Sequence, residues 1–195
     1  TIKVQKDVVL MAGATNSKFA NAKSDFSGPI PDYILNPPLI KPDMSNVDWN
    51  KGSKVNMIIE TKLAMIESWY RLPEQSKMVV LGIIGYKDFK AEMPAPVINW
   101  EIKDEYREIS NLQCQKAEGD FGGRHYIAWF APSLPLPYGP WKLGGLPGII
   151  LEATDSRNEV KFIFKRMTEV KDWEVVFYEE LRPTKLSEAA YYKVV

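Results

Sequence analysis

The sequence is poor in the residues that build most catalytic and metal centres. It contains one cysteine, Cys114, and one histidine, His125, among 195 residues. A lone cysteine excludes an internal disulfide and any multi-cysteine zinc site, and a lone histidine excludes the multi-histidine zinc sites. We therefore expect no metal site, no cofactor and no catalytic residues.

An excess of charge of either sign is also absent, because 25 Lys and Arg offset 25 Asp and Glu. This balance disfavours nucleic acid and anionic membrane surfaces as partners. No stretch approaches the roughly 20 apolar residues that a membrane-spanning helix needs, so we expect a chain that does not span a membrane. The first residue is Thr1 rather than Met, which is compatible with removal of a signal peptide or with a trimmed chain.

What the sequence does contain is enough apolar material, 45% of its residues, for one domain over residues 1–195. Short β-branched and aromatic runs separated by turn residues predict strands. Seven of them fall between residues 78 and 180, with short connections that favour an antiparallel meander. The predicted strands are 2–11, 78–84, 97–102, 112–121, 124–130, 149–154, 160–167 and 173–178.

Three segments differ from this β-rich pattern. Residues 28–52 carry five prolines, which predict a loop. Residues 53–70 place Val55, Ile59 and Leu63 near the 3.6-residue period, which predicts a helix, and residues 185–192 predict a C-terminal helix. The expected fold is a mainly β, strongly curved, half-barrel-like antiparallel sheet whose concave side is covered by helix 53–70.

Gly122 and Gly123 predict a tight hairpin between strands 112–121 and 124–130, because paired glycines supply the positive φ angles of a primed turn. In this register Asp120 faces His125, and Cys114 lies six residues further along the strand, about 20 Å away. A Cys-His nucleophilic dyad is therefore excluded. We expect Cys114 to be buried, and Ala117, Phe121, Tyr126 and Phe130 to form the core side of the hairpin.

The best-marked motif is Gly145-Leu146-Pro147-Gly148, followed by Ile149-Ile150. Further marks precede it: the strand with Cys114, Lys116 and Ala117, the Gly123-Arg124 turn, Ala128-Trp129-Phe130 and Gly139-Pro140. Together with Ser17, Phe19 and Asn99-Trp100, these residues resemble the GLPGLI family over most of the chain. The resemblance implies a bacterial protein of the cell envelope, periplasmic or secreted with its signal peptide removed. It implies no catalytic activity, since none is established for the family.

The bend itself admits two interpretations. Gly144, Gly145 and Gly148 around Pro147 suit a rigid turn in which backbone passes close to backbone, with Leu146 in the core. Alternatively, successive N–H groups near Gly144 and Gly145 form an anion-binding nest. The preceding segment, with Trp129, Tyr138 and Trp141 among four prolines, is either a docking surface or a plug over the open end of the sheet.

Two further residues bear on the choice of function. Arg124 can brace the Gly-Pro loop or bind a ligand carboxylate. Asp120 and His125 are an exposed cross-strand pair or an acid-base pair. The first hypothesis is a non-catalytic envelope protein that binds a lipophilic ligand or an outer-membrane partner. The nine residues assigned to that binding are Arg124, Trp129, Tyr138, Trp141, Gly144, Gly145, Leu146, Pro147 and Gly148.

Two alternatives remain open at this point. One is a hydrolase or transferase with a site near the Gly-Arg hairpin and the Gly-Pro bend, in which Arg124, His125 and Asp120 act together. The other is a purely structural subunit, which the residues do not separate from a binding protein.

Overall fold

The computed structural model describes residues 6–13, 17–21, 54–61, 67–72, 76–84, 87–170 and 184–194. Within these ranges, twelve strands form one sheet, accompanied by one helix, α2 (Glu188–Val194). The predicted mainly β fold is confirmed. Along the chain the strands are β1 (Lys6–Ala12), β2 (Ser17–Asn21), β3 (Lys54–Thr61), β4 (Ser68–Leu72), β5 (Lys77–Ile84), β6 (Lys87–Pro94), β7 (Glu101–Ile109), β8 (Leu112–Phe121), β9 (Arg124–Ala131), β10 (Ile149–Asp155), β11 (Lys161–Val170) and β12 (Thr184–Leu186).

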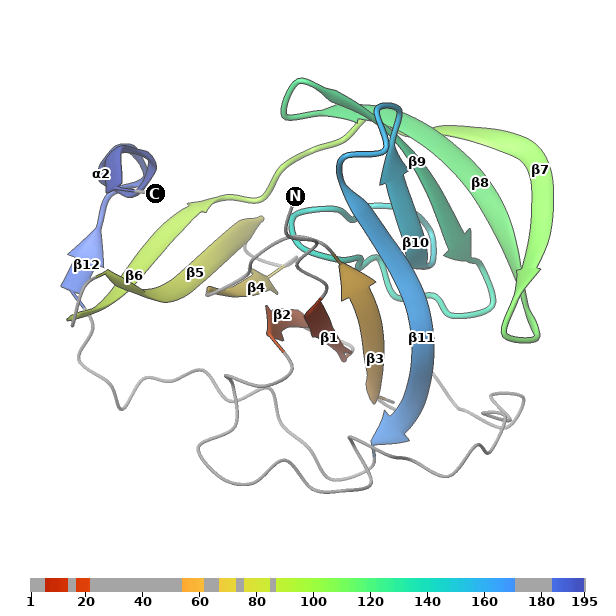
Figure 1. Cartoon of the computed structure of the whole chain (residues 1–195), viewed down its shortest axis with the longest axis horizontal. Helices are drawn as coiled ribbons and strands as arrows, with labels where there is room; N and C mark the ends of the chain where they lie inside the picture. Colours follow the sequence, from red (N-terminus) through yellow and green to blue (C-terminus); the bar gives the residue numbers. More distant parts are fainter. Residues whose placement is uncertain are drawn as a thin grey trace.

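The strands follow the order β12-β6-β5-β4-β2-β1-β3-β11-β10-β9-β8-β7 in the sheet. The parallel β12–β6 pair is the exception in an otherwise antiparallel arrangement. The sheet is strongly curved but not closed, with β12 at one edge and β7 at the other (Figure 1). As predicted, the fold is a curved, open, antiparallel-rich sheet.

Five of the predicted strands match closely, and each of them pairs with a strand next to it in the sequence. Predicted strands 78–84, 112–121, 124–130, 149–154 and 160–167 correspond to β5, β8, β9, β10 and β11. Strand 2–11 overlaps β1. Strand 97–102 is displaced, since β7 begins at Glu101, and β2, β6 and β12 are not predicted. The predicted C-terminal helix 185–192 corresponds to α2, but its first two residues belong to β12. The segments 28–52 and 173–178 lie outside the described residues.

The predicted helix over residues 53–70 is wrong, because its described residues form β3 and β4. The same apolar residues also repeat with period two: Met57 and Ile59 are fully buried, and β3 is rich in the β-branched residues that favour strands. Strand β3 pairs with β1 on one side and with β11 on the other. These distant partners outweigh the local helical pattern.

The hairpin of β8 and β9 has the predicted register. Asp120 faces His125, Phe121 faces Arg124, and the turn glycines Gly122 and Gly123 have φ of 57° and 73°. Ala117, Tyr126 and Phe130 are buried on the predicted core side, and Phe121 is half-buried there. We call this the inner face of the sheet and the opposite side, which carries His125, the outer face.

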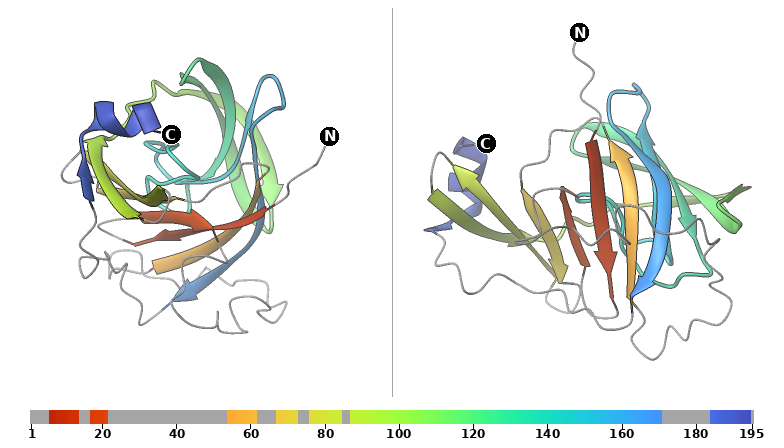
Figure 2. Two further views of the ribbon diagram at one scale, coloured as in Figure 1. Left: turned by 60° about the vertical axis from the view of Figure 1, so that its left-hand side comes forward. Right: turned by 60° about the horizontal axis from the view of Figure 1, so that its bottom comes forward.

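The segment 132–148 covers the inner face in place of the expected helix. Figure 2 shows it inside the curve of the sheet. Its buried side chains join the same apolar core as β1, β3 and β11. At the other end of the sheet, α2 packs against β6 and β12. No helix in the described ranges has the length and apolar character needed to cross a bilayer.

The centre of the core gives a first test of this packing. Phe162 is fully buried and meets the ring of Phe19 edge-on at 6.0 Å, whereas its neighbour Ile163 is 40% exposed. We expect Phe162→Ala to lower the free energy of unfolding by about 3 to 5 kcal/mol, because it leaves a cavity. The control Ile163→Ala should cost about 1 kcal/mol or less. Urea unfolding of both variants measures the difference; equal losses would contradict the packing.

Candidate functional site

Within segment 132–148, residues 134–138 alternate between core and solvent. Leu134, Leu136 and Tyr138 are buried, while Pro135 and Pro137 between them are exposed. This period of two follows from extended backbone, and the prolines hold that backbone extended without needing hydrogen-bond partners for N–H groups they lack. The segment therefore contributes to the core as well as forming surface.

The Gly-Pro bend is held by close backbone approach. A Cβ at Gly148 would lie 2.2 Å from the carbonyl oxygen of Ala131, so only glycine fits there. Gly144 is enclosed by the Pro137 carbonyl and the Arg71 guanidinium. Gly145 has φ of 91° and is exposed. Leu146 is buried and Pro147 is exposed.

Hydrogen bonds anchor this bend chiefly through its carbonyl groups. Arg71 donates to the carbonyl of Lys142 at 2.6 Å, and the indole of Trp100 donates to that of Gly144 at 2.9 Å. The N–H of Gly145 donates to the Pro137 carbonyl at 3.0 Å. That N–H is therefore engaged within the fold, which favours the rigid-turn interpretation over an anion-binding nest.

Arg124 braces a different turn from the one expected. Its guanidinium binds Asp155 at 2.6 Å and Glu159 at 2.5 Å, at the connection between β10 and β11. The carboxylate of Asp155 also accepts the N–H groups of Glu159 and Val160. The expected bracing of the Gly-Pro loop by Arg124 is thus replaced by bracing of the Asp155–Val160 turn.

Burial of Asp155 opposes its charged form, but these donors outweigh burial. The N–H of Val160, the Arg124 guanidinium and the N–H of Glu159 hold the pKa of Asp155 below its ordinary value.

The remaining candidates for catalysis lie on the outer face. His125 binds the Asp120 carboxylate at 2.8 Å, and both side chains are exposed. Arg124 and His125 are successive residues of a strand, so their side chains point to opposite faces. Cys114 is fully buried, and burial raises the pKa of its thiol to about 11. The proposed trio of Arg124, His125 and Asp120 therefore does not converge on one site.

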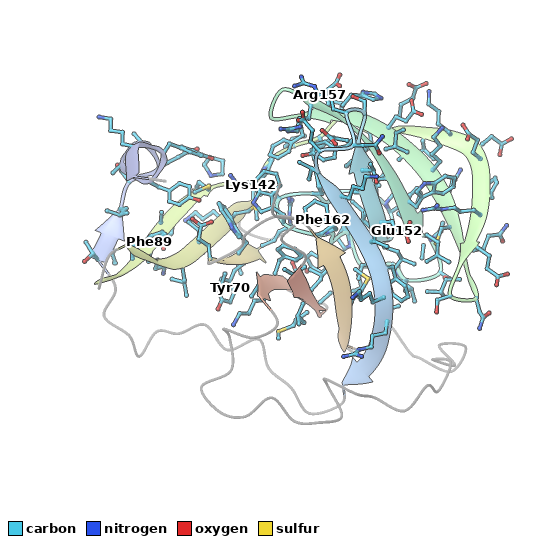
Figure 3. All side chains as sticks on the ribbon, in the orientation of Figure 1. Tyr70, Phe89, Lys142, Glu152, Arg157 and Phe162 are labelled. Carbon is cyan, nitrogen blue, oxygen red and sulfur yellow. The ribbon has the colours of Figure 1, made fainter. Side chains whose placement is uncertain are left out.

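The aromatic residues of the predicted binding surface are likewise divided between the faces. Trp129 lies on the outer face, and the guanidinium carbon of Arg107 is 4.3 Å from the centre of the Trp129 ring. Arg107 also forms an ion pair with Glu152. Tyr138 is fully buried on the inner side, and Trp141 packs against Phe121 with ring centres 5.9 Å apart. Glu152 and Lys142 mark these two separate regions in Figure 3.

A cluster around Lys142 is formed by residues that no sequence motif marks. This side chain is 8% exposed, and its ammonium group lies over the rings of Trp69, Trp141 and Tyr192 at 4.4, 5.0 and 5.2 Å. It also donates to the Tyr192 hydroxyl at 3.3 Å. Such rings stabilise a cation through their π faces. Burial lowers the pKa of Lys142, and the charges of Glu67 and Glu188 oppose that shift.

Three distant parts of the chain build this Lys142 cluster: β4, the segment 132–148 and α2. No local motif marks it, because its members are ordinary aromatic residues separated by long stretches of sequence. Among the described residues, no group of His, Cys, Asp and Glu side chains is arranged to hold a metal ion.

The comparisons with known proteins concern the fold alone. No family model and no curated protein matches the sequence. Two solved structures of PNGF-II, in C2 and P21 crystal forms, are similar to 98% of this chain with a TM-score of 0.57 and 10% sequence identity. This chain corresponds to 32% and 33% of those PNGF-II chains, about a third of their length.

The close approach at the bend predicts a strong substitution effect. Gly148→Ala should lower the free energy of unfolding by about 3 kcal/mol or more, because the backbone of Ala131 must move. Gly122→Ala is a suitable control, since nothing lies within 4 Å of a Cβ there and only the positive φ is unfavourable. We expect that control to cost about 1 to 2 kcal/mol. Both variants are measured by thermal and urea unfolding. A similar loss of unfolding free energy in the two would contradict a structural need for the close approach of Gly148 to Ala131.

The lowered pKa of Asp155 predicts acid sensitivity. A carboxylate whose folded pKa lies below its unfolded value stabilises the fold above the unfolded pKa, near 4, and loses that contribution as pH falls through the folded pKa. Asp155→Asn keeps an oxygen for the two N–H groups but loses the ion pair with Arg124. We expect the variant to be less stable at pH 7, with the difference narrowing below pH 4. A constant difference from pH 7 to pH 2 in urea unfolding would contradict this assignment.

Proposed function

We propose that this chain is a non-catalytic, GLPGLI-type protein of the bacterial cell envelope, periplasmic or secreted, that binds a partner protein through strand β7. The partner contributes an extended segment with apolar and basic side chains, which adds to the sheet beside β7. The observation that carries the proposal is the exposure of β7 on both faces at the edge of the sheet.

Position and exposure set β7 apart from the other strands of the β7–β10 half. It pairs with β8 on one side and has no further strand on the other in the described part of the chain. Seven of its nine residues are exposed and Lys103 is half-buried, so that Ile109 is the one buried residue of the strand. An unpaired edge presents backbone N–H and C=O groups that a partner segment can use.

The inner face of β7 supplies apolar contacts for such a segment. Ile102 and Tyr106 face Ala117 and Gln115 of β8, on the inner side, and remain 45% and 52% exposed. Large apolar side chains exposed together on one strand favour a protein partner.

The charges of β7 favour a basic partner. Lys103 pairs with Glu101 and Glu118, and Arg107 pairs with Glu152, so both cations are already matched. Asp104 and Glu108 form no ion pair with any described residue. A partner with Lys or Arg at matching positions would complement these carboxylates.

A bulge makes this edge selective. The register of β7 against β8 shifts between Ile102 and Tyr106, and the Gln115 side chain donates to the Lys103 carbonyl at 2.9 Å. Bulges of this kind disfavour indiscriminate edge-to-edge pairing. A partner segment is therefore expected to pair beyond the bulge, along the Tyr106–Ile109 end of the strand.

A partner protein is better supported than the two other functions considered. The core side chains of segment 132–148 occupy the inner side of the sheet where a lipophilic ligand was expected. The residues considered for a hydrolase or transferase lie on opposite faces or are bound in ion pairs. The support for the envelope location and for family membership is the sequence motif around residues 145–148. The backbone packing requires a glycine at position 148 of that motif.

Site-specific photo-cross-linking tests this function. A benzophenone amino acid in place of Tyr106, in cells of the source bacterium, should give a discrete protein adduct in the envelope fraction. Asp104→Lys with Glu108→Lys should reduce that adduct at least about fivefold, because the attraction for a basic segment becomes repulsion.

Tyr192 provides the matched control position, because it is 56% exposed but lies on α2 at the other end of the sheet. The same cross-linker there should not give the adduct. No protein adduct at Tyr106, or equal adducts at both positions, would overturn the proposal. A lipid adduct at Tyr106 would instead identify a lipophilic ligand.

A further inference from the structure

The Lys142 cluster contains a buried positive charge that forms no ion pair with any described carboxylate. The Lys142 side chain is 8% exposed, and an ammonium group has three N–H donors. Among the described residues it makes one hydrogen bond, to the Tyr192 hydroxyl at 3.3 Å. Buried charges in proteins normally have an ionic partner, because burial without one is costly. This charge therefore points to a binding role.

Two carboxylates in the neighbourhood do not pair with this charge. Glu67 accepts hydrogen bonds from the Trp69 indole at 3.2 Å and from the Tyr191 hydroxyl at 3.1 Å. Glu188 is exposed in the first turn of α2. Both carboxylates favour the charged form of Lys142 from a distance. The ammonium group thus keeps two N–H donors that Glu67 and Glu188 do not use.

Tyr192 lies directly over the ammonium group of Lys142, with its ring centre 5.2 Å from Nζ. Its hydroxyl donates to the sulfur of Met93 at 3.8 Å, and a thioether is a weak acceptor. Burial and the charge of Glu188 hold the pKa of Tyr192 above its ordinary value, so this hydroxyl stays neutral and does not offset the positive charge. The side chain is 56% exposed. A ligand can therefore displace it by turning it toward solvent.

Trp141, which precedes Lys142, has an unfavourable backbone conformation. Its φ is 53°, in the left-handed region that bulky side chains rarely adopt. The half-buried ring packs against Phe121 with ring centres 5.9 Å apart, and it lies beside the Lys142 ammonium group. Strained backbone conformations cluster at ligand-binding sites. Here the strain adjoins a buried charge that lacks an ionic partner among the described residues.

We propose that the Lys142 cluster binds an aromatic carboxylate, which displaces the Tyr192 side chain and forms an ion pair with the ammonium group. The Tyr192 phenol indicates what fits there, a six-membered ring with an oxygen acceptor that meets Nζ. A carboxylate adds the negative charge that the phenol lacks, and charge-assisted hydrogen bonds are stronger than neutral ones. The half-buried Trp141 ring contributes an aromatic contact. This site is separate from the β7 edge, which lies at the other end of the sheet order from the β12 edge where α2 docks.

An NMR titration of the full chain with benzoate tests this site against benzamide, a neutral molecule of the same shape. We expect benzoate to bind at least about tenfold more tightly than benzamide, because only benzoate forms the ion pair. Lys142→Met removes the charge but keeps an unbranched side chain, and it should abolish this preference. Lys193→Met is the matched control, since Lys193 is exposed on α2 and its loss changes the net charge equally. The control should keep the preference.

Glu188→Gln provides a second test that leaves the buried core intact. Because Glu188 repels a carboxylate, the variant should bind benzoate about twofold more tightly or better at low salt, with benzamide unchanged. Equal affinities of the unsubstituted protein for benzoate and benzamide would overturn the proposal. A preference for benzoate that persists in folded Lys142→Met would overturn it as well, because the carboxylate would then bind elsewhere. An unchanged benzoate affinity in Glu188→Gln would have the same consequence.

Discussion

The approach of the Gly148 backbone to the Ala131 carbonyl is the contact on which the rest of the architecture depends. It lets segment 132–148 leave β9, run along the inner face and enter β10 beside its starting point. The returning segment then accepts hydrogen bonds from Arg71 in β4 and from Trp100 before β7. Two regions far apart in the sheet order are thereby tied to one bend. A side chain at position 148 would clash with the backbone of Ala131 and Pro132.

This arrangement decides where binding chemistry is available. The bend is packed into the core, Arg124 is bound by two carboxylates, and Cys114 is buried. Accessible groups are found along the edge strand β7 and on the outer face, where Asp120 and His125 are exposed. One edge presents apolar and acidic side chains, and the other is covered by a short strand and helix. A curved open sheet with a filled inner side therefore leaves its margin at β7, rather than a central site, as the surface that we propose for binding a partner protein.

The parts of the fold that could be predicted from sequence are those formed by neighbours in the chain. The β8–β9 register follows from Gly122 and Gly123 alone, and the burial of Tyr126 and Phe130 follows from that register. Strand β3 was mistaken for a helix, since its pairing partners lie elsewhere in the sequence. The Lys142 cluster was missed for the same reason. The partners of Arg124 were likewise hidden, because Asp155 and Glu159 come from the turn after the next strand.

The pairing of β3 with β11 has a consequence for the order of folding. Thr61 lies opposite Phe162, about 100 residues further along the chain, whereas β7 to β11 join neighbours in sequence. Closing a long loop costs more entropy than closing a short one, and distant contacts slow folding. The β7–β11 half should thus acquire structure early and serve as a template for β3 and β1. Formation of the β3–β11 ladder then becomes the slow, committing step.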